Sequence, residues 1–156
     1  MKGISVIALA LAIALPGSSA IAQSAKSLVG AWELESAGDT YGKNPKGKLV
    51  LSPNGHYALI IMRNDLPKFA SNSRVKGTPD ENKAVVAGSV AHFGRWAVDE
   101  KAKVLTLKIE SSTYPNFTGT EQPRPFELKG DQLRYTNAKP SAGGAPTGPV
   151  VWNRAK

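Results

Sequence analysis

Hydrophobic and polar residues alternate in short segments along most of the chain, which is the pattern of half-buried β-strands. In residues 103–111, Leu105, Leu107 and Ile109 share one face, and polar residues occupy the other. Segments that read as strands, separated by turn residues, lie at 28–36, 48–52, 56–62, 93–98, 103–111, 124–129, 132–136 and 150–154. The sequence therefore predicts about eight strands, most with one face directed toward a core.

The turns between these segments favour sequential hairpins. Pro53, Asn54 and Gly55 separate two apolar segments, and Gly130 and Asp131 separate another pair. Asn and Gly tolerate positive φ, which tight hairpins need. Closing such a meander removes its exposed edges, and about eight strands enclose an interior that is filled or holds one small ligand. We expect an all-β, antiparallel, up-and-down barrel.

One segment in the middle of the chain predicts a helix. Thr78 can cap the free N–H groups, Pro79 suits the first helical position, and Glu81 completes a capping box. The helix is expected to run to about Ala91, with small, weakly apolar residues that suit packing against the barrel wall. Residues 56–62 are apolar on both faces, so they could contact the interior on one side and this helix on the other.

The first residues resemble a cleavable export signal. Lys2 precedes an apolar run at 4–15 that is too short for a stable membrane-spanning helix. Small residues at Ala20 and Ala22 form a cleavage motif, so we expect cleavage after Ala22 and one mature domain at 23–156. The Ala-rich signal is typical of bacteria and predicts a periplasmic or secreted protein. The alternative is an uncleaved membrane anchor.

Composition narrows the classes of function. The chain carries 20 basic and 12 acidic residues, a formal net charge of +8, and losing Lys2 with the signal leaves +7. The basic residues are scattered, which favours a solvated surface over a nucleic-acid interface. The chain has no cysteine, and its histidines, His56 and His92, stand 36 residues apart, so we expect no disulfide, metal site or other cofactor.

Several motifs together resemble a known family. Gly30 and Trp32 are similar to the Gly-x-Trp start of lipocalins, and Trp152 and Arg154 resemble the Trp-x-Arg ending of bacterial lipocalin-like proteins. Residues 114–126 look like that family's Pro-Asn-(Trp/Phe)-x-Gly-x-x-Gln-x-Arg-x-Phe segment. The order and spacing of these motifs span nearly all of the mature chain. The resemblance implies a lipocalin-like barrel more than a particular activity.

The resemblance also implies structural roles at the two chain ends. In lipocalins, the first-strand Trp lies at the barrel floor beneath an Arg from near the chain end, so Gly30, Trp32, Trp152 and Arg154 are expected to be structural. One departure from the family pattern is notable. Many members carry a His on the strand before the Pro-Asn segment, whereas residues 105–109 contain none.

Three arginines are candidate anchors for an anionic ligand, since an inward guanidinium can bind a carboxylate or phosphate with several donors. They are Arg63, Arg95 and Arg124. The alternative for each is an outward side chain on a solvated face. Arg124 shares a face with Phe126 and Leu128 and is the strongest candidate. The sequence leaves open which face of residues 93–98 points inward, and therefore where Arg95 lies.

Aromatic residues could line the mouth of a ligand pocket, because an apolar ring with a polar tip suits that boundary. The alternative is that they belong to the core. The candidates are Tyr57, Trp96, Tyr114, Phe117, Phe126 and Tyr135.

The sequence supports three functions in descending order. The first is binding of a small apolar or amphipathic molecule, with an anionic one as an option because of the arginines. The second is an interaction or structural barrel without a small ligand. The third is a small barrel enzyme, an isomerase or cyclase, in which Tyr57, His92, Arg95 or Arg124 supplies the acid or base. No catalytic motif is recognised, and the ligand and the oligomeric state remain open.

Overall fold

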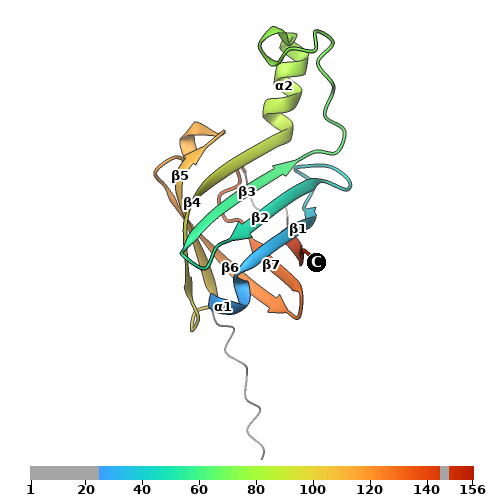
Figure 1. Ribbon diagram of the computed structural model, residues 1–156. Helices are drawn as coiled ribbons and strands as arrows, with labels where there is room; N and C mark the ends of the chain where they lie inside the picture. The colour runs from blue at the N-terminus through green and yellow to red at the C-terminus, as the bar shows by residue number, and fades with distance from the viewer. Residues whose placement is uncertain (1–24, 145–147) are drawn as a thin grey trace, which may run out of the picture.

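The computed structural model describes residues 25–144 and 148–156, which form a closed antiparallel barrel (Figure 1). Each strand pairs with the next along the chain, and the last returns to the first. This confirms the predicted up-and-down barrel, while the predicted signal at residues 1–22 lies outside the described residues. The strands are β1 (Gly30–Ala37), β2 (Lys46–Leu51), β3 (His56–Met62), β4 (Ser89–Asp99), β5 (Val104–Ser112), β6 (Glu121–Lys129), β7 (Gln132–Thr136) and β8 (Pro149–Arg154).

The barrel interior is filled mostly by the alternating apolar residues that the sequence pattern identified. Leu105 and Leu107 are fully buried, and Leu133 on β7 is as well. Phe126, Leu128 and Tyr135 also point inward, as predicted. Apolar burial of this kind is the main stabilising contribution in a domain that has no disulfide.

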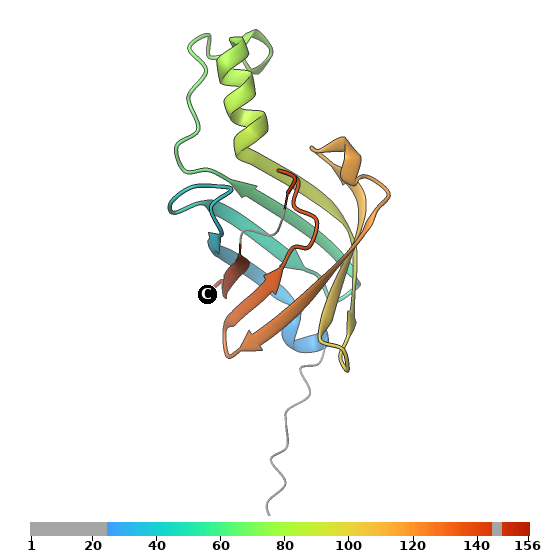
Figure 2. The same cartoon turned by 180° about the vertical axis from the view of Figure 1, so that it is seen from behind.

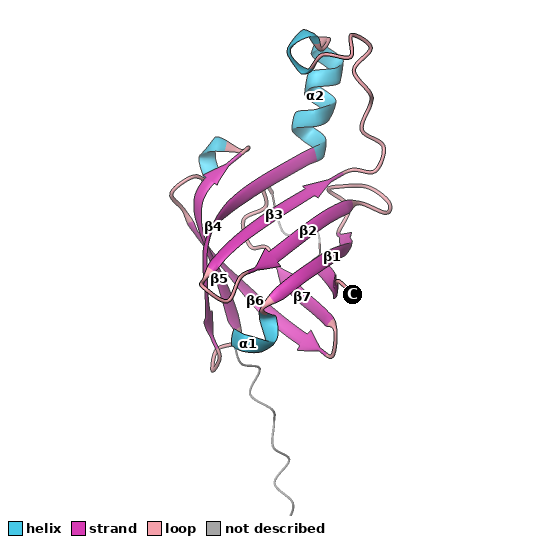
Figure 3. Ribbon diagram, viewed as in Figure 1, coloured by secondary structure: helices cyan, strands magenta, loops and turns pink. Residues whose placement is uncertain are grey.

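The helices lie at the ends of the barrel (Figure 3). They are α1 (Ala25–Leu28), the 3₁₀ turns η1 (Arg74–Lys76) and η2 (Pro115–Phe117), and α2 (Pro79–Gly88). The capping box predicted for α2 is present, because the Thr78 side chain accepts from the Glu81 N–H and the Glu81 carboxylate accepts from the Thr78 N–H. The helix ends at Gly88, earlier than predicted, because Ser89 already begins β4. No helix in the described part of the chain is long and apolar enough to cross a membrane.

α2 lies near the barrel, at its end, and does not pack on its wall. The helix extends beyond one end of the barrel and continues directly into β4 (Figures 1 and 2). Leu66 of the preceding loop lies against Gly88 at the end of the helix, and Phe69 lies against Gly77, two residues before its start. The small residues of α2 offer little area to bury against a wall, and its direct continuation into β4 directs it away from the barrel. The outer face of β3 therefore stays uncovered, and Ile60 is exposed there.

Two prolines restrict the pairing of β6 with β7 to part of β6. The Phe126 N–H donates to the Lys103 carbonyl on the β5 side, so the alternate nitrogens of Pro123 and Pro125 face the β7 side. Proline has no N–H to donate, and the β6–β7 ladder begins only at Phe126. The upper half of β6 therefore pairs with β5 alone. Part of the segment after β7, residues 139–143, lies beside this half of β6.

Candidate functional site

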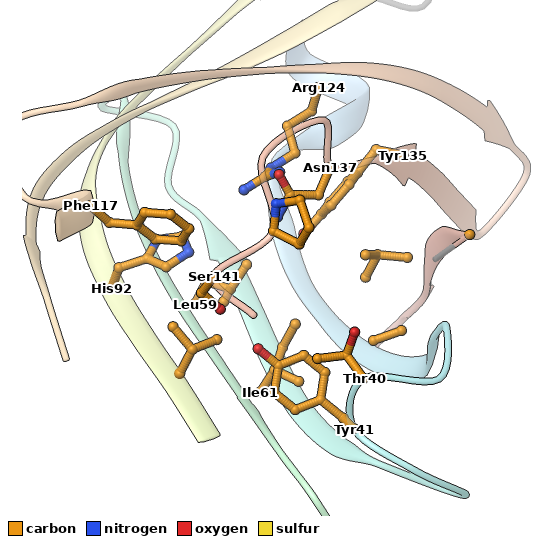
Figure 4. A pocket seen from close by; sticks show the side chains of 15 residues that line it. Thr40, Tyr41, Leu59, Ile61, His92, Phe117, Arg124, Tyr135, Asn137 and Ser141 are labelled. Atoms are coloured by element: carbon orange, nitrogen blue, oxygen red, sulfur yellow. The ribbon is translucent and has the colours of Figure 1, made fainter. Parts of the chain in front are cut away.

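A cavity of about 50 Å³ lies inside the barrel, and its lining includes Ile61 and Val90, which lie close to the junction of α2 and β4. Figure 4 shows the residues that line it. Apolar side chains cover much of the surface, among them Leu59, Ile61 and Phe117. Polar groups are concentrated elsewhere on the lining: Thr40, Tyr41, His92, Arg124, Tyr135, Asn137 and Ser141. An apolar surface with a few converging polar groups is typical of a small-molecule site.

Among the residues that the structure describes, Arg124 is the only charged one that lines this cavity. Its residue surface is 2% exposed, and its guanidinium points into the cavity from β6 (Figure 4). Nη2 donates to the side-chain oxygen of Gln122, and the guanidinium carbon lies 5.3 Å from the centre of the Tyr135 ring. Within residues 25–144 and 148–156, Nε and Nη1 are buried without a hydrogen-bond partner. Burial lowers the pKa of Arg124, yet a guanidinium remains protonated at physiological pH.

Tyr57 and His92 form a buried hydrogen-bonded pair beside the arginine. The Tyr57 hydroxyl lies 2.9 Å from His92 Nδ1, and the His92 ring packs edge-on against Phe117. Burial, assisted by the positive charge of Arg124, lowers the pKa of His92 to about 4. Burial raises the pKa of Tyr57. Both groups are therefore neutral at physiological pH, and they leave the charge of Arg124 uncompensated.

The cavity mouth is formed by loop residues that sequence reasoning missed. Tyr41 interacts through its hydroxyl with the Ser141 side chain, and burial raises the pKa of Tyr41. Asn137 and Pro140 complete this side. Gln122 was also missed, because the strand was expected to begin at Arg124. Extending the two-residue alternation backward from Arg124 would have found Gln122, whereas the loop residues carry no periodic signal.

A second arginine closes the opposite end of the barrel. The Arg154 guanidinium carbon lies 4.2 Å from the centre of the Trp32 ring. Nη1 and Nη2 donate to the carbonyls of Val29 and Ser27 at 3.0 and 2.7 Å, and Nε donates to the Asp131 carboxylate at 3.1 Å. This is the contact that the resemblance implied.

The contacts of Gly30 and Trp152 also indicate structural roles. Gly30 adopts φ +137°, and a Cβ there would lie 3.0 Å from Arg154 Nη1, so a larger residue would be strained and would crowd the arginine. Trp152 is fully buried, with its ring centre 6.4 Å from that of Tyr135.

Comparison with known proteins agrees with this geometry. The lipocalin-like domain family matches residues 29–155. The chain belongs to the lipocalin-like domain family. One similar curated protein is the 4'-hydroxy-3'-methoxypropiophenone carrier protein ppsC of Aspergillus oryzae (strain ATCC 42149 / RIB 40). It is 29% identical over 86 residues, which cover 51% of this chain and 78% of the relative.

The lipocalin-like barrel brings only some of the predicted ligand residues together. Arg124 and Tyr135 line the cavity. Tyr57 contacts the cavity lining through His92, and Phe126 is buried in the core. Trp96 points inward but is half-buried away from the cavity, where its Nε1 donates to the Ser52 carbonyl at 3.0 Å.

The structure corrects the expected positions of the other two arginines. Arg95 lies on the outer face of β4, where its Nε is 3.7 Å from a Glu110 carboxylate oxygen. Arg63 follows β3 in an exposed turn and pairs with Asp65 at 2.7 Å. His92, Gly94 and Trp96 occupy the inward face of β4, which answers the question that the sequence left open. Arg63 and Arg95 therefore do not contribute to the cavity.

The described residues contain no group of three or more His, Cys, Asp or Glu placed to hold a metal ion. The residues that line the cavity offer hydrogen bonding, aromatic contact and the positive charge of Arg124.

Proposed function

We propose that this lipocalin-like protein binds and carries a small amphipathic molecule, with Arg124 as the anchor for its polar end. The observation that carries the proposal is the buried guanidinium with two unpartnered nitrogens at the wall of a cavity. Membership of the lipocalin-like family and a relative named as a carrier protein support it.

The surroundings of Arg124 define the chemistry of the ligand. A buried charge without a partner is unfavourable. Within the described part of the chain, Arg124 donates to one side chain, that of Gln122, which is neutral. A carboxylate or phenolate oxygen would supply both charge and acceptors, and a carbonyl oxygen would supply acceptors alone. We propose an anionic or strongly accepting oxygen as the polar end of the ligand.

The compound named as the cargo of the relative has the same kinds of chemical group as the proposed ligand. It is an aromatic ketone that carries a hydroxyl and a methoxy group, so it combines an apolar ring with oxygen acceptors. A small oxygenated aromatic compound is the class that we propose for this chain. We further propose that the chain is exported, with its signal removed after Ala22, which N-terminal sequencing of the protein from its own source would test.

The carrier function is tested by native mass spectrometry of the protein purified from its own source without denaturation. We expect an additional mass that is lost on unfolding and absent from Arg124→Gln. The matched control is Arg134→Gln on the exposed face of β7, which should keep the additional mass. Bare protein, or equal retention by both variants, would contradict the proposal.

A second candidate function rests on the Tyr57–His92 pair. A buried neutral imidazole that is hydrogen-bonded to a hydroxyl beside a cavity is an arrangement that can move a proton, as an isomerase or cyclase requires. The test is incubation of the wild-type protein and Tyr57→Phe with the released ligand. Conversion by the wild type that Tyr57→Phe abolishes would favour the enzyme, and recovery of unchanged ligand would favour the carrier.

A further inference from the structure

The interior cavity is too small to hold the whole of the proposed ligand. Its volume of about 50 Å³ accommodates roughly four water molecules, whereas a buried site for a single benzene ring has about 150 Å³. The polar end of an aromatic ligand fits beside Arg124, but its ring system needs additional space.

That space lies directly outside the cavity. A cleft of about 380 Å³ runs between η2 and the segment 139–143. Phe117, Pro140 and Ser141 line both the cleft and the interior cavity, so the two share a wall of side chains. Gln122, which holds the Arg124 guanidinium, lines the cleft as well. Figure 2 shows η2 and the neighbouring loop at the same end of the barrel.

The cleft follows from the sequence of β6. Pro123 and Pro125 prevent β7 from extending along the upper half of this strand, so no strand covers the wall there. The side chains of Gln122 and Phe117 separate the cavity from the cleft in place of a backbone ladder. Side chains can adopt other rotamers without breaking the barrel, which a paired strand cannot do.

The cleft has an aromatic surface. Tyr114 and Phe117 pack edge-to-face with their ring centres 5.0 Å apart, and Tyr114 is only half-buried. Lys139 and Glu121 lie at the same cleft, so its lining combines the two rings with polar side chains and with one charge of each sign. Such rings favour an aromatic partner, because edge-to-face and offset-stacked ring pairs are attractive beyond the area that they bury.

We infer that this cleft is the second half of the ligand site. The ligand is an elongated aromatic acid or phenol that extends from Arg124, past Phe117, to Tyr114. This inference rests on the proposed function, because it assigns the outer part of the same ligand.

The experiment compares two carboxylates of different length, benzoate and 4-phenylbenzoate, by calorimetric titration of the full protein. We expect the wild type to bind 4-phenylbenzoate at least about tenfold more tightly, because the single ring of benzoate extends only to Phe117 and a second ring reaches Tyr114. Tyr114→Ala should remove this advantage and leave benzoate unchanged. Tyr114→Phe keeps the ring and should keep the advantage, which separates loss of the contact from loss of the fold.

A further variant locates the second ring. Phe93→Ala removes an exposed ring from a separate groove on the outer wall and should change neither affinity. The inference would be overturned if the wild type bound both carboxylates with equal affinity. It would also be overturned if the tighter binding of 4-phenylbenzoate were lost in Phe93→Ala but kept in Tyr114→Ala. In either case, benzoate binding that depends on Arg124 would still uphold the proposed function. Absence of any Arg124-dependent binding would overturn both.

Discussion

The two ends of the barrel each place an arginine against an aromatic ring, and the two arginines differ in how their donors are used. At the floor, all three nitrogens of Arg154 donate to protein oxygens. At the mouth, only Nη2 of Arg124 donates to a described residue, the neutral amide of Gln122. The Arg124 residue is 2% exposed, whereas the Arg154 side chain is 30% exposed. The more deeply buried cation thus has the fewer partners, which is the reverse of what stability alone favours.

The difference follows from the backbone near each residue. Arg154 lies beside α1, whose end and following residue present the carbonyls of Ser27 and Val29 as acceptors, as the carboxyl ends of helices do. Arg124 stands within a strand, where the side chain projects into the interior and the backbone carbonyls point sideways along the sheet, away from it. The floor arginine therefore stabilises the fold, and the mouth arginine retains donors for a ligand.

Trp32→Ala should give the largest effect, because it removes a fully buried ring and the contact with Arg154. We expect the free energy of unfolding to fall by about 4 kcal/mol, measured by urea denaturation. Trp32→Phe should lose less because it keeps an aromatic ring. A loss below about 1 kcal/mol would show that the floor contact is not a main source of stability.

Acidification should destabilise the mouth through His92. Because the folded pKa is about 4 and the unfolded pKa is 6.5, the unfolded chain binds the proton first. This contribution is complete above pH 6.5 and is lost as the pH falls toward 4, by on the order of 3 kcal/mol. Urea denaturation from pH 7 to 4 should show a shallower pH dependence in His92→Gln than in the wild type, and an unaltered one in the exposed control His56→Gln. Identical profiles in His92→Gln and the wild type would contradict this assignment.

Arg154→Leu should lower the free energy of unfolding by about 2 kcal/mol, because it leaves the carbonyls of Ser27 and Val29 without their partner and removes the cation over Trp32. Arg154→Lys keeps the charge but loses some of the hydrogen-bond donors, so its free energy of unfolding should lie between those of the wild type and Arg154→Leu. Thermal and urea unfolding measure both, and wild-type stability of Arg154→Leu would contradict the structural role.

Arg124→Leu should have the smallest effect on stability, with the free energy of unfolding unchanged or higher by about 1 kcal/mol, since replacing a buried unpaired charge removes an unfavourable burial. The same substitution should abolish ligand binding. If Arg124→Leu lowered the free energy of unfolding as much as Arg154→Leu does, Arg124 would also stabilise the fold, which would contradict the distinction between the two arginines.

The sequence predicted most of the barrel because its strands alternate with period two. Leu105, Leu107 and Ile109 could be assigned inward from that pattern alone, and Arg124 was identified because it shares a face with Phe126 and Leu128. The Trp32–Arg154 contact came from the family resemblance.

Other features could not be predicted from periodicity. In residues 92–98, one face of the strand carries His92 and Trp96, and the other carries Phe93 and Arg95. Because each face has an aromatic and a polar residue, the pattern could not show whether Arg95 points inward or outward. Phe93 points outward beside exposed Val50 and Ile60, a grouping that exists only in the folded barrel. Tyr41 and Ser141 belong to loops that no periodic signal places at the cavity mouth.

The central claim is that Arg124 serves a ligand's negatively charged oxygen and Arg154 serves the fold. The measurement that tests it most directly is the affinity of benzoate and of its neutral analogue benzamide for the wild type and for Arg124→Gln, by calorimetric titration. The account predicts that the wild type prefers benzoate by at least about tenfold and that Arg124→Gln has lost this preference. An equal preference in both proteins would contradict it.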